Sequence, residues 1–240
     1  MSDNNKIYFV GAGPGDPELI TVKGRRLLES ADLVLFAGSL VNPALLENVG
    51  GQKIDSYGMR LEDITRTMVD ALQEGKTVVR LHSGDPSLYG AIIEQINELA
   101  EHDVEVEVVP GVSSVFATAA ALGTQLTLKG VSETLIITRP AGKTLEKDAL
   151  AALSRHGATM AVFLGTHMIE EIVKSVEYPP DTPAAVVYHA SWEDQQIIRG
   201  TVSDIADKVK AAGLTRSAMI LIGGVVDPVH YRRSHLYAPQ

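Results

Sequence analysis

Residues 6–29 read KIYFVGAGPGDPELITVKGRRLLE, and the fold class follows from them. The apolar run at residues 6–10 predicts a strand, because short runs rich in β-branched and aromatic side chains favour that structure. The glycines and prolines of residues 11–17 predict a loop, and residues 21–29 predict a helix. A strand, a short loop and a helix in this order are typical of a βα unit, whose strands pair in parallel.

The same alternation of apolar runs and helical periods continues along the chain. Further strands are predicted at residues 33–36, 77–81, 104–108, 134–138, 159–164, 184–188 and 218–222. Further helices are predicted at residues 61–72, 92–99, 148–155, 168–176 and 203–212. The uncharged residues 111–128 are rich in Gly, Ser, Thr and Ala, which suits a buried helix and loop better than a bilayer span.

The pattern therefore predicts an α/β protein of two domains with mainly parallel sheets. The N-terminal domain is expected over residues 1–112 and the C-terminal domain over residues 113–240. Clefts between domains are common ligand sites, so a site between these two is expected.

The composition narrows the classes of function. The 240 residues are 45% hydrophobic and 21% charged, which is ordinary globular composition and argues against disorder. The net charge of −9 disfavours nucleic-acid binding. Cysteine is absent, which excludes disulfides, thiolate nucleophiles and cysteine-held metals. The first residues, MSDNNK, carry an acid and lead into a short apolar run, so no signal peptide, no membrane partner and a cytoplasmic location are expected.

The loop at residues 11–17, GAGPGDP, follows a strand, as the dinucleotide-binding motif G-x-G-x-x-G does. The spacing fails, because the third glycine would fall at Asp16, whose carboxylate would face a pyrophosphate. Two interpretations stay open: a tight turn, or a rigid loop that borders a ligand other than a phosphate.

Two further loops also follow predicted strands. Residues 82–90, HSGDPSLYG, lie where ligands of open α/β sheets bind, outside the carboxyl end of a strand. Asp85 could bind a ligand there, or it could form an Asx-turn ahead of the next helix. Residues 110–114, PGVSS, offer N–H donors and hydroxyls at a helix N-terminus, although capping explains the serines equally well. Val115 stands where a nucleophile elbow needs glycine.

The seven histidines form no H-E-x-x-H motif or other ligand spacing. A metal held by protein side chains is therefore not predicted.

The three loops, in this order, carry a resemblance. The similar stretches are YFVGAGPGDPELITVKGRRLLESADLVLFAGSLVNPALL (8–46), LHSGDPSLYGAI (81–92), VPGVSS (109–114), ITRPAG (137–142), AVFLGTHM (161–168) and VVYHASWEDQQIIRGTV (186–202). Over essentially the whole chain, the sequence resembles the tetrapyrrole (corrin/porphyrin) methylase superfamily. Within that superfamily, the first two stretches are most similar to the cobalt-precorrin-4 and precorrin-4 C11-methyltransferases.

The resemblance implies a homodimer and a cofactor, S-adenosyl-L-methionine, which is held between the two domains and becomes S-adenosyl-L-homocysteine. It also implies which residues contact the cofactor: Pro14, Ser83, Gly84, Asp85, Leu88, Ser113, Ser114, Leu164 and Ala190. Ser83 and Ala190 replace glycines of the uroporphyrinogen-III branch, which argues against that branch.

The implied reaction is methylation of C11 of cobalt-precorrin-4 or precorrin-4 in cobalamin (vitamin B12) biosynthesis. A sulfonium donor and an electron-rich ring mainly require alignment and exclusion of water, so no catalytic triad and no essential histidine are expected. Any cobalt would travel in the substrate. The candidates for substrate carboxylates are Arg80, Lys129 and Arg139, and Asp16 is a candidate for a pyrrole N–H.

Two alternatives stay open. A sibling enzyme would act at another ring position, as on uroporphyrinogen-III or precorrin-3B, or on a non-tetrapyrrole. A non-catalytic module would bind S-adenosylmethionine without turnover.

Overall fold

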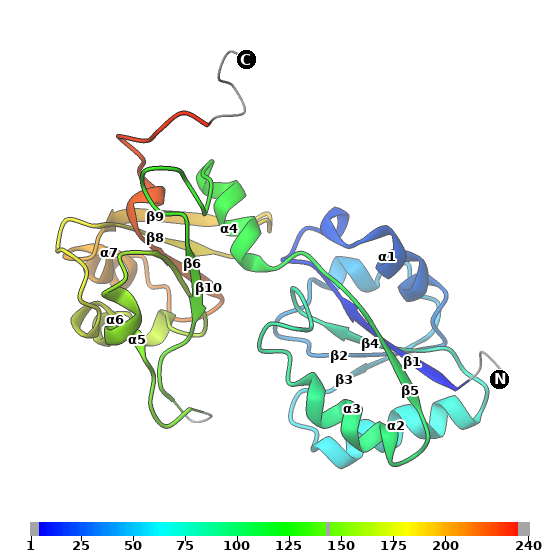
Figure 1. Ribbon diagram of the computed structural model, residues 1–240. Helices are drawn as coiled ribbons and strands as arrows, with labels where there is room; N and C mark the ends of the chain where they lie inside the picture. Colours follow the sequence, from blue (N-terminus) through cyan, green and yellow to red (C-terminus); the bar gives the residue numbers. More distant parts are fainter. Residues whose placement is uncertain (1–4, 143–144, 235–240) are drawn as a thin grey trace. The chain divides into compact units, whose positions relative to one another are not determined.

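The computed structural model describes residues 5–142 and 145–234 (Figure 1). The chain divides into two compact units, residues 1–114 and residues 115–240. Within the described residues, each unit consists of a five-stranded sheet and the helices that cover it. No helix in the described part of the chain is long and apolar enough to cross a membrane.

The sheet of the first unit has the strand order β3-β2-β4-β1-β5, and each of these neighbouring pairs is parallel. Its strands are β1 (Lys6–Gly11), β2 (Leu33–Phe36), β3 (Gln52–Asp55), β4 (Val78–His82) and β5 (Glu105–Val109). Its helices are α1 (Val22–Glu29), α2 (Leu61–Gln73) and α3 (Ile92–Ala100), with short 3-10 helices η1 (Pro17–Leu19) and η2 (Pro43–Leu46).

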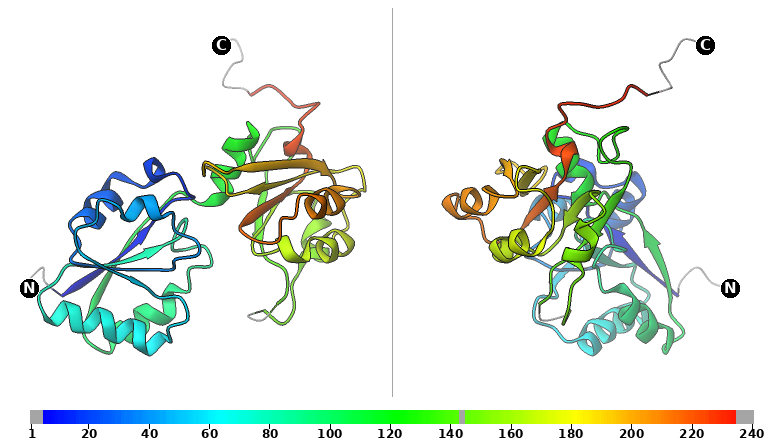
Figure 2. Two further views of the ribbon diagram at one scale, coloured as in Figure 1. Left: turned by 180° about the vertical axis from the view of Figure 1, so that it is seen from behind. Right: turned by 60° about the vertical axis from the view of Figure 1, so that its left-hand side comes forward.

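Alternate strand residues point to opposite faces of this sheet, and each face has its own apolar core. Ile7 and Phe9 of β1 pack with α2 and α3, whereas Val10 packs with α1 on the other face. Figures 1 and 2 show α1 over one face and α2 with α3 over the other. All three side chains are fully buried, and each such burial contributes roughly 1.5–3 kcal/mol. Packing on both faces thus fixes the strands, and it also fixes the positions at which the loops at their carboxyl ends begin.

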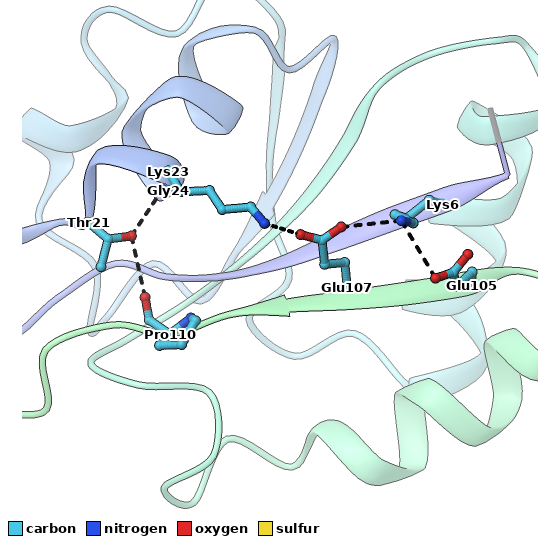
Figure 3. A network of polar contacts seen from close by, with 7 residues as sticks. All are labelled: Lys6, Thr21, Lys23, Gly24, Glu105, Glu107 and Pro110. Carbon is cyan, nitrogen blue, oxygen red and sulfur yellow. Dashed lines mark hydrogen bonds and ion pairs between the residues drawn. The ribbon is translucent and has the colours of Figure 1, made fainter. Parts of the chain in front are cut away.

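A polar network holds β5 against β1 and α1 (Figure 3). Glu107 on β5 accepts hydrogen bonds from Lys6 Nζ at 3.3 Å and from Lys23 Nζ. The hydrogen bond from Lys23, and then the one from Lys6, lower the pKa of Glu107. Thr21, which caps α1, donates to the Pro110 carbonyl at 3.4 Å. These contacts fix the chain where β5 runs into the loop that begins at Pro110.

The second unit has the strand order β6-β7-β10-β8-β9. Its strands are β6 (Leu135–Thr138), β7 (Thr159–Val162), β8 (Pro183–Tyr188), β9 (Gln196–Thr201) and β10 (Ala218–Ile222). Its helices are α4 (Ser114–Leu122), α5 (Leu150–Ser154), α6 (Ile169–Ser175) and α7 (Ile205–Ala211), with 3-10 helices η3 (Thr166–Met168) and η4 (Gly224–Val226). Apolar side chains of α4 pack on one face of this sheet, and those of α5, α6 and α7 pack on the other.

Strand direction differs between the two sheets. In the second sheet β6 and β7 are parallel, whereas β10 runs antiparallel to β7 and β8, and β9 runs antiparallel to β8. Five strand pairs among the described residues are parallel and three are antiparallel. The prediction of an α/β protein with mainly parallel sheets is confirmed. The sequence pattern did not predict β3 and β9, each of which lies at one edge of its sheet, whereas it did predict β5 and β6 at the opposite edges.

Candidate functional site

Three loops meet at the carboxyl edge of the first sheet, where β1, β4 and β5 end. Two backbone hydrogen bonds join the first two loops: Gly13 N donates to Gly84 O at 3.2 Å, and Gly84 N donates to Gly13 O at 2.9 Å. Ala12 N also donates to His82 O, at 2.7 Å. This edge is where ligands of open parallel sheets bind, so the loops form the candidate site of the first unit.

Glycine allows the third loop to approach the other two. A Cβ atom on Gly111 would collide with the Gly84 carbonyl oxygen, and a Cβ atom on Gly11 would lie 2.5 Å from Gly111 Cα. Because these distances are far below van der Waals contact, no larger residue fits without moving backbone. The three loops therefore pack backbone against backbone.

Asp85 ties the second loop to the third. Its Oδ2 accepts a hydrogen bond from Gly111 N at 2.9 Å, and its Oδ1 accepts hydrogen bonds from Ser87 N at 2.9 Å and from the Ser87 hydroxyl. Partial burial raises the pKa of Asp85, but the hydrogen bonds from Ser87 and Gly111 outweigh this, so the pKa lies below its ordinary value. The ionised carboxylate forms the Asx-turn and also links two loops.

Other cofactor candidates of the first unit lie half-buried on these loops: Pro14, Ser83, Leu88 and Ser114. Ser113 is buried and lies beside Gly84. A Cβ atom added to Gly84 would lie 3.8 Å from the Cα atom of Ser113. The fold thus brings the first-unit candidates to one edge of one sheet.

Asp16 lies on the same loop as Pro14 and is half-buried. Its Oδ1 accepts a hydrogen bond from Glu18 N at 2.8 Å, so it caps η1. Asn42 Nδ2 donates to the Gly15 carbonyl at 2.9 Å and fixes this loop from another side. The loop of residues 11–17 is therefore braced at several points.

Leu164 and Ala190 follow β7 and β8, which run in the same direction because both are antiparallel to β10. The beginning of β10 contacts both loops. The carbonyl of its first residue accepts a hydrogen bond from the Thr166 hydroxyl at 3.2 Å, and the Ser217 carbonyl accepts one from His189 N at 3.1 Å. The second sheet therefore brings both candidates to one edge.

Left-handed backbone conformations mark these second-unit loops. The φ angles of Leu164, His189 and Ser191 are 56°, 46° and 73°. Such a conformation costs roughly 1–2 kcal/mol for an L-residue, and it often persists where function requires it. At Leu164 it also explains why the strand predicted over residues 159–164 ends early. The Leu164 side chain is 57% exposed, so it can contact a ligand.

Aromatic side chains brace the loop that carries Ala190. The His189 ring stacks on Tyr188 and on Trp192, with centroids 3.8 and 4.6 Å away. The His189 Nδ1 lies 2.9 Å from Asp194 Oδ1. Ala190 itself is buried in the core that packs against α4.

The three candidate cations lie in different surroundings. Arg80 is buried on the α2–α3 face of the first sheet, where burial lowers its pKa to about 10 and Asp55 opposes that change. Arg139 follows β6 directly, at the edge where β7 also ends. Lys129 lies in a turn whose Ser132 hydroxyl accepts a hydrogen bond from the first residue of β7 at 3.0 Å. The structure therefore places Lys129 near the beginning of β7 and Arg139 near the end of β6 and β7. Since these strands are parallel, the two residues lie toward opposite ends of the strands and are not brought together.

Sequence reasoning missed two residues beside Arg80. The Nε of Arg80 donates to Gln95 Oε1 at 3.1 Å, and His82 lies two residues along the same face of β4. Burial, and then the charge of Arg80, lower the pKa of His82 to about 3, so its ring is neutral. Strand alternation could have placed His82 beside Arg80, but no sequence signal points to Gln95.

Metal ligands do not gather in the part of the chain that the structure describes, since no three His, Cys, Asp or Glu residues there form a group that could hold an ion. His235, the seventh histidine, lies outside the described residues.

The fold and these loops define a class of protein. The family model of the tetrapyrrole (corrin/porphyrin) methylases matches residues 6–206, and the chain belongs to this family. It is 52% identical to the cobalt-precorrin-4 C(11)-methyltransferase of Methanocaldococcus jannaschii, over 99% of this chain and 94% of that protein. It is 48% identical to the precorrin-4 C(11)-methyltransferase of Pseudomonas aeruginosa, over 97% of this chain and 98% of that protein.

Solved structures give the same result. The X-ray structure of a cobalt precorrin-4 methyltransferase, a cobalamin biosynthetic enzyme, matches with a TM-score of 0.90 and 44% identity, over 94% of this chain and 97% of that chain. The uroporphyrin-III C-methyltransferase of Thermus thermophilus, in complex with S-adenosylhomocysteine, matches with a TM-score of 0.78 and 28% identity, over 95% and 96% of the two chains.

Proposed function

We propose that this chain is an S-adenosyl-L-methionine-dependent methyltransferase that methylates C11 of cobalt-precorrin-4 or precorrin-4 in cobalamin biosynthesis. The observation that carries the proposal is the match, over nearly the whole chain, to relatives named for this reaction. The converging glycine loops of the first unit give that reaction a site. The acidic net charge of −9 supports a small-molecule substrate over a nucleic acid.

The loops suit a nucleoside with an amino-acid tail. Backbone groups around Gly84 can approach such a ligand closely, and the backbone of Ser113 and Ser114 lies beside Gly84. The exposed side chain of Leu164 offers an apolar contact for an adenine ring. The proposed cofactor contacts are Pro14, Ser83, Gly84, Asp85, Leu88, Ser113 and Ser114, with Leu164 and Ala190 from the second unit.

S-adenosylmethionine, when bound, supplies a methyl group on a sulfonium whose leaving group is neutral. The task of the chain is then to align the ring carbon with the S–CH₃ bond and to exclude water. Alignment of this kind contributes roughly 7–11 kcal/mol to lowering a barrier. The braced loops, held by Asp85 and by the contact of Gly11 with Gly111, suit this task without any covalent role for a side chain.

Cations are proposed to receive the substrate carboxylates. Arg80 and Arg139 each lie on or beside a strand that leads to the candidate loops. Lys129 lies near the opposite end of β7, so it would bind a different carboxylate of the substrate from the one that Arg139 binds. The Asp16 carboxylate, oriented by its turn, is proposed to accept a pyrrole N–H.

The proposal also covers the oligomeric state, the location of the protein, and whether its substrate carries cobalt. A homodimer is expected from the family resemblance, and a cytoplasmic location is proposed beside it. Cobalt enters only as part of the substrate, and relatives named for the cobalt and the metal-free substrates both match the chain.

A turnover assay tests the proposal. Isotopically labelled S-adenosylmethionine is offered with cobalt-precorrin-4 and with metal-free precorrin-4 in parallel. Label in one product preferentially would support the function and assign the branch. Tight binding of S-adenosylhomocysteine with no label in either product would favour a sibling enzyme or a non-catalytic module. Failure to bind S-adenosylhomocysteine would overturn the proposal.

A further inference from the structure

Arg80 is a buried cation whose hydrogen-bonding capacity is only partly used. In register it lies between Phe9 of β1 and Leu35 of β2, both 0% exposed, and it is itself 7% exposed. Its Nε donates to Gln95 Oε1 at 3.1 Å. Its Nη1 has no hydrogen-bond partner among the described residues. A charged donor left unpaired in the interior is strongly unfavourable, which suggests that a ligand completes the arrangement.

Gln95 orients this guanidinium without neutralising it. The Gln95 side chain, on α3, is 5% exposed, and its Nε2 donates to the Ala91 carbonyl at 3.0 Å. That bond fixes the amide, so its oxygen faces Arg80. Because an amide carries no charge, the positive charge of Arg80 remains available to an anion.

The carboxylate whose charge acts on Arg80, that of Asp55, is hydrogen-bonded elsewhere. Asp55, at the end of β3, accepts hydrogen bonds from Gly38 N and Tyr57 N, both at 2.9 Å. Asp55 is close enough to raise the pKa of Arg80, yet no ion pair joins the two among the described residues. His82, on the same face of β4, is neutral and supplies no counter-charge, and its Nε2 also has no partner within the described part of the chain.

We infer that Arg80, positioned by Gln95, binds one carboxylate arm of the tetrapyrrole substrate through Nη1. The identity of this ligand rests on the proposed function. Nη1 is fully buried in this structure, so an arm reaches it only when the side chains that cover it move, and the end of an acetate or propionate arm is small enough to enter whereas the macrocycle is not. A charge-assisted hydrogen bond in such a place fixes the ring in one orientation, which selects the carbon that receives the methyl group.

Two substitutions at Gln95 separate this role from a structural one. Gln95→Glu keeps the size of the side chain and pairs Arg80 with an internal carboxylate, so it competes with the substrate arm. Gln95→Met removes both amide hydrogen bonds but leaves the cation unpaired. A purely structural role makes Gln95→Met the more damaging change, whereas the binding role makes Gln95→Glu the more damaging one for substrate.

The measurements are KM and kcat for the tetrapyrrole, the Kd of precorrin-4 in the presence of unreactive S-adenosylhomocysteine, and the Kd of S-adenosylhomocysteine. Gln95→Glu and Arg80→Met should each raise the tetrapyrrole KM on the order of 10- to 100-fold, and Gln95→Met should raise it less. The Kd of S-adenosylhomocysteine should stay within about twofold, since only the substrate arm is affected. Lys76→Met, which removes a cation beyond the other end of β4, is the control.

Three results would overturn the inference: an unchanged KM in folded Gln95→Glu, a larger effect of Gln95→Met, or a parallel loss of S-adenosylhomocysteine affinity. Should Arg80→Met fail to fold, the two Gln95 variants decide alone. The proposed function is tested separately by the unmodified chain. If the unmodified chain binds precorrin-4 but transfers no methyl group to it, the proposed function is wrong. The Kd values of the variants for precorrin-4 would still test whether Arg80 binds a carboxylate arm.

Discussion

The Asp85 carboxylate accepts a hydrogen bond from the backbone N–H of Gly111 at 2.9 Å, and this contact joins the loops that follow β4 and β5. The same carboxylate accepts hydrogen bonds from Ser87, so a single side chain shapes its own loop and links it to the next. Cofactor affinity should therefore depend on Asp85 even if its oxygens never touch the cofactor.

Asp85→Ala should lower the affinity for S-adenosylhomocysteine by about tenfold or more, because the two loops lose their link. It should also reduce the free energy of unfolding by about 1–3 kcal/mol, because the Gly111 N–H loses its acceptor. Calorimetry and urea unfolding measure the two effects. Asp63→Ala, which removes a surface carboxylate paired with Arg60 on α2, is the control. An Asp85→Ala variant with unchanged affinity would contradict the assigned role.

Gly111→Ala should destabilise the first unit by about 1–3 kcal/mol, the usual range for overpacking, and should weaken S-adenosylhomocysteine binding. Its new Cβ atom would strike the Gly84 carbonyl. Gly50→Ala is the matched control, because a Cβ atom there meets nothing within 4 Å. Thermal unfolding of both variants tests the packing. Equal stability of the two would show that the three loops do not pack as described.

The His82 ring should stay neutral to strongly acidic pH, because burial and the charge of Arg80 lower its pKa from 6.5 to about 3. The unfolded chain takes up this proton below about pH 6.5 and the folded chain does not, so His82 makes the folded state less stable as the pH falls from 6.5 toward 3. An NMR titration, with the His82 signal assigned through His82→Phe, measures the midpoint. A midpoint near 6.5 in the folded protein would show that the ring is not buried.

Leu164→Gly should separate the effect of backbone strain on stability from the effect of the Leu164 side chain on cofactor binding. Glycine adopts the φ of 56° without the cost to an L-residue, but it also loosens the unfolded chain, so the free energy of unfolding should change by less than about 1 kcal/mol. The affinity for S-adenosylhomocysteine should nevertheless fall, because the exposed apolar side chain is gone. Parallel unfolding and binding measurements test this. Retained affinity would remove Leu164 from the proposed site.

The sequence pattern predicted the strands that carry apolar runs or a clear alternation, and it missed β3 and β9. Residues 33–36 and 218–222 were predicted with the bounds that β2 and β10 show, because both carry buried apolar runs. In contrast, β3 (QKID) holds a single apolar residue and β9 (QIIRGT) holds two between polar residues, so neither has an apolar run long enough to indicate a strand. The βα alternation predicted parallel pairs, but the antiparallel pairs of the second sheet were not predicted, since an apolar run does not show the direction of its strand.

The site shows the same division. The rule that ligands bind at the carboxyl ends of parallel strands pointed to the loops after β1, β4 and β5, and the structure brings them together. The contact of Arg80 with Gln95 joins a strand to the next helix, and only the packing of α3 on the sheet creates it. The separation of Lys129 from Arg139 likewise follows from the direction of β6 and β7, which two isolated basic residues cannot reveal.

The most direct test of the central claim is the position of the methyl group in the product. Precorrin-4 and cobalt-precorrin-4 are each incubated with the protein and S-adenosylmethionine labelled with ¹³C in its methyl group, and NMR locates the label on the ring. The account predicts a single labelled methyl group at C11 in at least one of the two products. A labelled methyl group at any other ring carbon, or no transfer to either ring by a protein that binds S-adenosylhomocysteine, would contradict it.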